Sequence, residues 1–102
     1  MQRLVEQPVD DGEVFEGSSR RGRVRYHLSV YQHFSEDAEG ESMPAHVDVE
    51  GRITALDPFD VTHLHQRAVE LTLRLADGRH LDFQIANEGG TIRSTGRGLY
   101  TP

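Results

Sequence analysis

Six histidines stand in this chain of 102 residues, and imidazole is the side chain best suited to binding a metal or moving a proton near neutral pH. His63 and His65 would lie on one side of an extended segment. His27 and His46 are expected on the outward faces of two strands, and His33 continues the row of His27. A metal site needs three or four converging ligands, which the sequence does not show. Scattered surface histidines are therefore the simpler interpretation, and we predict no metal ligand.

A basic segment is the second candidate for chemistry. Its cations are Arg20, Arg21, Arg23 and Arg25, and the same strand continues with the outward His27 and Tyr31. Small barrels bind single-stranded nucleic acid with arginines beside exposed aromatic rings. The alternative is that Arg23 and Arg25 pair across strands with Asp48 and Glu50. Because the net charge is −6, nucleic-acid binding is the less favoured interpretation.

Motifs of the common enzyme classes are missing from the sequence. It contains no Gly-x-Ser-x-Gly, no phosphate-binding glycine-rich loop and no paired-histidine helix motif. An acid–base pair of His27 with Asp48 is the only catalytic arrangement that we considered, and it ranks below binding. We therefore predict no catalytic residue and no cofactor.

Charge is unevenly distributed along the chain. Residues 1–17 sum to −4, residues 18–34 to +4, residues 35–50 to −6 and residues 51–102 to 0. The chain has no cysteine, which excludes disulfides and thiolate chemistry. No apolar run approaches the roughly 20 residues that span a bilayer, and no secretion leader is visible. A soluble protein located in the cytoplasm is expected.

Two long segments alternate between apolar and polar residues. In residues 23–34 the inward set is Val24, Tyr26, Leu28 and Val30, and in residues 45–55 it is Val47, Val49 and Ile53. A period of two predicts strands with one buried face. Gly51 falls on the inward face, which indicates a bulge or a close backbone approach. Residues 35–43, rich in acids, are predicted to form the loop between these strands.

Residues 69–85 predict a hairpin around Ala76-Asp77-Gly78. A two-residue Asp-Gly loop would set Leu73 opposite Asp82 and turn one apolar row into water. A three-residue loop, with Gly78 in the left-handed conformation, pairs Leu73 with Leu81 instead. The sequence therefore predicts the longer loop, with the inward residues Leu71, Leu73, Leu75, Leu81, Phe83 and Ile85.

The expected fold is a single all-β domain over residues 1–102. It is a small antiparallel meander barrel or sandwich of five to seven strands, with at most one short helical turn that Asp57 would cap. Residues 1–12 are expected to be a loose N-terminal arm, and residues 96–102 a weakly ordered tail.

A non-catalytic module that binds a protein partner or a small ligand is the leading functional hypothesis. Small barrels often enclose a ligand or pair through an exposed edge strand, so a homodimer is expected. Binding of nucleic acid through residues 20–25 and a histidine-based metal or acid–base site are the alternatives.

Overall fold

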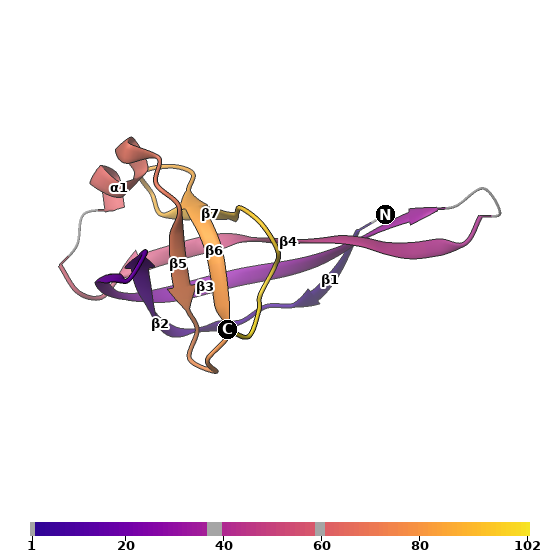
Figure 1. Cartoon of the computed structure of the whole chain (residues 1–102), viewed down its shortest axis with the longest axis horizontal. Coiled ribbons are helices and arrows are strands. Elements are labelled where there is room, and N and C mark those ends of the chain that lie inside the picture. Colours follow the sequence, from indigo (N-terminus) through magenta and orange to yellow (C-terminus); the bar gives the residue numbers. More distant parts are fainter. Residues whose placement is uncertain (1, 37–39, 59–60) are drawn as a thin grey trace.

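The structure, a computed structural model, describes residues 2–36, 40–58 and 61–102. Seven antiparallel strands and one helix follow each other along the chain (Figure 1). The strands are β1 (Gln2–Glu6), β2 (Val9–Glu16), β3 (Ser19–Glu36), β4 (Ser42–Ala55), β5 (Leu71–Arg74), β6 (His80–Ile85) and β7 (Thr91–Ser94), and the helix is α1 (Val61–Arg67). The predicted all-β class and strand number are confirmed.

Six of the strands form a closed ring. The sheet order is β1-β3-β2-β5-β6-β7-β4, and an additional pairing of β3 with β4 joins its two sides. One row of inward side chains on each strand then faces a common interior, so that no apolar face is left in water. Strand β1 stays outside the ring, because it pairs with β3 beyond the point where β2 pairs with it.

The hairpin of β3 and β4 extends well beyond the ring (Figure 1). These strands have 18 and 14 residues, whereas most strands in globular proteins have 3–10 residues. Their distal parts leave the ring as an extension, which we call the projecting ribbon (residues 31–36 of β3 and 42–48 of β4). Strand β1 pairs with the first part of this ribbon, from Tyr31 to His33. The ribbon accounts for the elongated shape, 53 Å by 27 Å by 22 Å.

The interior of the ring is filled by packed side chains. All thirteen residues predicted to face inward are buried except Val47, which packs against the core while partly exposed. The sequence analysis missed three further core residues, namely Val14, Leu64 and Ile92. Leu64 comes from α1, so the helix adds an apolar side chain to the core. Tyr26 and Phe83, the two aromatic side chains predicted to face inward, are 2% and 0% exposed.

The three-residue loop between β5 and β6 is confirmed. Leu73 lies opposite Leu81, and the Leu75 amide donates a hydrogen bond of 2.8 Å to the Arg79 carbonyl. Gly78 has a φ of 91°, a conformation that glycine adopts without the steric cost of a Cβ. The Ala76 amide also donates to the Tyr26 hydroxyl at 3.1 Å, which ties this loop to β3.

Both ends of the chain are more structured than the sequence predicts. Most of the expected loose arm, residues 1–12, lies in β1 and β2, with Pro8 in the break between them. The long β3 offers a backbone edge along which these residues pair, and no local pattern reveals that edge. In the tail, Tyr100 forms a β-bridge with His80 and donates its hydroxyl to Asp82 at 2.8 Å.

The helix begins later than predicted. Asp57 does not cap it, because α1 starts at Val61 and the Asp57 carboxylate instead accepts a hydrogen bond from the Arg23 amide at 3.0 Å. In the part of the chain that the structure describes, no helix is both long and apolar enough to cross a membrane.

Gly51 occupies the close contact that its inward position predicted. It lies opposite Leu28 on β3 and Ile92 on β7. A Cβ at this position would come within 2.0 Å of the His27 carbonyl oxygen. Only a residue without a side chain allows β3 and β4 to pass this closely.

Truncation of Leu73 tests the filled core. Leu73→Ala should lower the free energy of unfolding by about 2–5 kcal/mol, because the side chain is fully buried and leaves a cavity. The matched control is Leu56→Ala, since Leu56 is 43% exposed. Denaturant unfolding measures both variants, and an equal loss in the two would contradict the packing described here.

Candidate functional site

Three side chains of metal-ligand type meet on the projecting ribbon. Tyr31 lies opposite Asp48, and Gln32 lies opposite Val47. The register shifts between Gln32 and Phe34, and there the His33 ring stacks on the His46 ring. Because side chains two residues apart share one face of a strand, Asp48 lies on the face of His46, diagonally across from His33.

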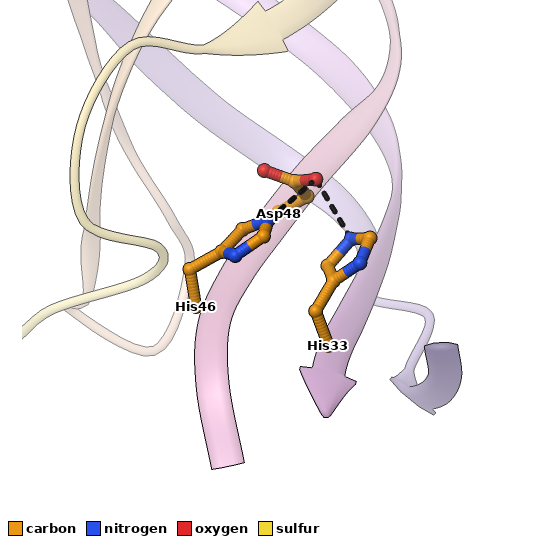
Figure 2. A group of neighbouring side chains, drawn as sticks. All are labelled: His33, His46 and Asp48. Carbon is orange, nitrogen blue, oxygen red and sulfur yellow. Dashed lines mark ion pairs between the residues drawn. The ribbon is translucent and has the colours of Figure 1, made fainter. Parts of the chain in front are cut away.

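The distances within this cluster are short (Figure 2). The His33 Nε2 atom lies 2.8 Å from Asp48 Oδ2, and the His46 Nε2 atom lies 3.6 Å from the same oxygen. The two imidazole rings stack with centroids 4.2 Å apart and planes inclined by 11°. The His33 side chain is 26% exposed, against 66% for His46 and 53% for Asp48. The cluster is thus open to solvent on one side.

A β-bulge in β4 creates this arrangement. Near the tip of the ribbon Phe34 faces Pro44, and below the bulge Gln32 faces Val47. Ala45 and His46 together therefore stand opposite the single residue His33. Bulges commonly redirect side chains in this way. The Gln32 side-chain amide donates to the carbonyl oxygens of His33, at 2.9 Å, and of His46, at 3.2 Å, so it links the two histidine-bearing backbones.

The other histidines do not join the cluster. Within the described ranges, His33, His46 and Asp48 are the only group of three potential metal ligands whose donor atoms lie within 4.8 Å of one another. His27 lies on β3 opposite Val9 and Arg52. The acid–base pair of His27 with Asp48 is not formed, because Asp48 contacts His33 and His46 instead.

The four arginines of the basic segment are engaged in ion pairs within the chain. Arg20 and Arg23 contact Asp57 at 3.1 and 3.3 Å. Arg21 contacts Glu16 at 2.7 Å, and Arg25 contacts Asp11 at 2.9 Å. These carboxylates compete with any phosphate for the same guanidinium groups. Tyr31 lies farther along β3, between Leu4 and Asp48, so the six predicted site residues do not form one site.

The predicted pairing of Arg23 and Arg25 with Asp48 and Glu50 is wrong. The register places Arg25 opposite Thr54 on β4 and opposite Asp11 on β2, while Arg23 is opposite Glu13. Asp57 follows β4 and reaches back to Arg23. The Arg23 amide, together with the guanidinium groups of Arg20 and Arg23, lowers the pKa of the Asp57 carboxyl from its ordinary value of 3.8.

An open backbone edge lies beside the cluster. Within the described residues, β1 pairs with β3 on one side and with no strand on the other. Leu4 and Val5 of β1 are 45% and 57% exposed. Edges of this kind, with exposed apolar side chains, are templates for pairing with another chain.

Sequence reasoning identified His33 and His46 as outward residues but did not bring them together. The predicted loop, residues 35–43, has its midpoint at residue 39, which would set His33 opposite Ala45. That register holds only at the ribbon tip, where Ser35 faces Met43. The bulge shifts it by one residue, and the sequence carries no recognisable mark of a bulge there. The open edge at β1 was also not predicted, because it depends on the pairing of β1 with a distant part of the chain.

The fold and the site define a small closed antiparallel barrel with a ribbon that carries histidines. Comparisons with models of known protein families, with curated proteins and with solved structures find no match to this chain.

Asp57→Asn tests the network of the basic segment. A carboxyl group whose pKa is lowered by folding stabilises the folded state where it is ionised in the unfolded chain, and this stabilisation is lost as the pH falls through the lowered pKa. The variant should therefore melt below the parent protein at neutral pH, and the difference should shrink on acidification. Thermal midpoints across this pH range measure it, with Glu88→Gln as the control for net charge. Identical midpoints at neutral pH would contradict the assignment.

Proposed function

We propose that this protein is a non-catalytic interaction module that pairs with a second copy of itself through β1. The observation that carries the proposal is the open edge. Closure of a sheet into a ring removes its free edges, and here the ring leaves β1 outside. Of the five large hydrophobic residues that are exposed in the described part of the chain, Leu4 and Val5 lie on this short strand.

The side chains of β1 suit antiparallel pairing with an identical strand. Leu4 faces Tyr31 on one face of the sheet, whereas Arg3 and Glu6 face Gln32 and Val30 on the other. Val5 is the extra residue of a bulge. Arg3 and Glu6 therefore lie on the same face as each other, opposite to the face of Leu4. A two-fold axis through Leu4 then sets Leu4 against its copy and Arg3 against Glu6 of the other chain, where Glu6 also contacts Arg79 of its own chain at 2.7 Å. Both contacts are favourable across antiparallel strands.

Two features make the alternative functions weaker. The interior is filled, with Phe83 and Leu73 fully buried, which gives a small apolar ligand little support inside the ring. The arginines that would contact nucleic acid are paired with carboxylates of the same chain. These observations favour contacts made by the outer edge of the molecule.

Leu4→Glu tests the pairing. The change brings two carboxylates together at the proposed two-fold axis, so the dissociation constant of the dimer should rise at least about tenfold, or roughly 1.4 kcal/mol. Sedimentation equilibrium over a concentration series measures it. Leu56→Glu is the matched control, because Leu56 is 43% exposed, like Leu4 at 45%, but lies outside β1.

A charge exchange tests the register. Arg3→Glu and Glu6→Arg should each weaken self-association, because like charges then face each other. A mixture of the two variants should associate again, since both cross-strand contacts regain opposite signs. A parent protein that stays monomeric at the highest accessible concentration would refute the proposal, as would unchanged association of Leu4→Glu.

A further inference from the structure

We infer that His33, His46 and Asp48 form a binding site for a divalent transition-metal ion of the zinc, nickel or copper class. The site lies on the projecting ribbon, where His33 is opposite Gln2 of β1, but it uses side chains of β3 and β4 only and does not require the proposed self-pairing. The observation behind it is the convergence of two imidazole nitrogens on one carboxylate oxygen (Figure 2).

The donor set determines the class of ion. Imidazole nitrogen suits zinc, copper, nickel and iron, whereas magnesium and calcium prefer sites made of oxygen ligands. Two imidazoles and one carboxylate supply three ligands, one fewer than closed structural zinc sites use. An ion bound here would therefore keep at least one position for water or for a ligand from another molecule.

The spacing of the donor atoms suits a single ion. Metal–ligand bonds of about 2.0–2.2 Å in tetrahedral geometry separate neighbouring ligand atoms by roughly 3.3 Å. The His33 and His46 Nε2 atoms lie 2.8 and 3.6 Å from Asp48 Oδ2, on either side of that value. The stacked rings must turn toward a common point for both nitrogens to coordinate. His46 has room to do so because its side chain is 66% exposed.

The backbone around the cluster is held in place before any ion binds. His33 and His46 face each other at the bulge, and the Gln32 amide bonds to both of their carbonyl oxygens. The half-buried His33 loses little further freedom on coordination. Ligands already positioned by their strands lower the entropic cost of binding.

Charge near the cluster favours a cation. Residues 40–50, which include His46 and Asp48, contain three acids and no basic side chain other than the histidine. Such a concentration of one sign raises the local concentration of ions of the opposite sign. On the neighbouring strand β1, Arg3 lies opposite Gln32. The four arginines of the basic segment are paired with carboxylates elsewhere on the barrel.

Titration of the full-length, untagged protein with Zn²⁺ and Ni²⁺ by calorimetry tests the inference. We expect one equivalent of each ion to bind per chain, and His33→Ala, His46→Ala and Asp48→Asn each to weaken binding at least about tenfold, the scale at which loss of even a supporting group is felt. Mg²⁺ should not compete. Paramagnetic Ni²⁺ should broaden the amide resonances of the projecting ribbon, which locates the ion independently of affinity.

Matched variants give the controls. His27→Ala removes an exposed histidine from the same strand, and Glu88→Gln removes an exposed acid outside the projecting ribbon; both should bind like the parent chain. The affinity for Zn²⁺ should not change with protein concentration, which separates this site from self-pairing. The inference is overturned if no ion binds, if His27→Ala loses as much affinity as His33→Ala, or if broadening falls outside the ribbon.

Discussion

The pairing of β3 with β4 serves both halves of the molecule. Val24 faces Ala55 at one end of this pairing, and Glu36 faces Ser42 at the other. Near Val24 the two strands close the ring and bury the core. Farther along they leave the ring, carry the histidine cluster and provide the edge along which β1 lies. A slip of one residue would turn every side chain of a strand to the opposite face, so core and cluster would be lost together.

Local alternation was enough to predict most of the core. The spacing of Leu71, Leu73, Leu81 and Phe83 determines which face of each strand is buried, and it requires a three-residue loop that ends at Gly78. These relations span few residues, so the sequence alone contains them. The contribution of α1 was missed because Leu64 stands in a short helix without a regular apolar spacing.

The cluster depends on information that alternation does not contain. His33 and His46 are brought opposite each other by an extra residue in β4, near Pro44, that shifts the register midway along the hairpin. The residues at the bulge, Pro44 and Ala45, are neither charged nor large and apolar, so the alternation of polarity does not reveal the extra residue. The pairing of β1 depends in turn on the length by which β3 exceeds the ring. Both features follow from contacts between distant segments. The bulge brings the histidines together, and the pairing of β1 leaves an open backbone edge.

The close approach at Gly51 has a consequence for the divergence of this fold. The carbonyl oxygen of His27 occupies the space where any Cβ would stand, at the place where β4 lies between β3 and β7. Substitutions in the ribbon and the loops can accumulate without opening the ring, but any substitution of Gly51 would force β3 and β4 apart. Distant descendants of a common ancestor should therefore keep glycine in the middle of this strand even after their surfaces have lost all similarity.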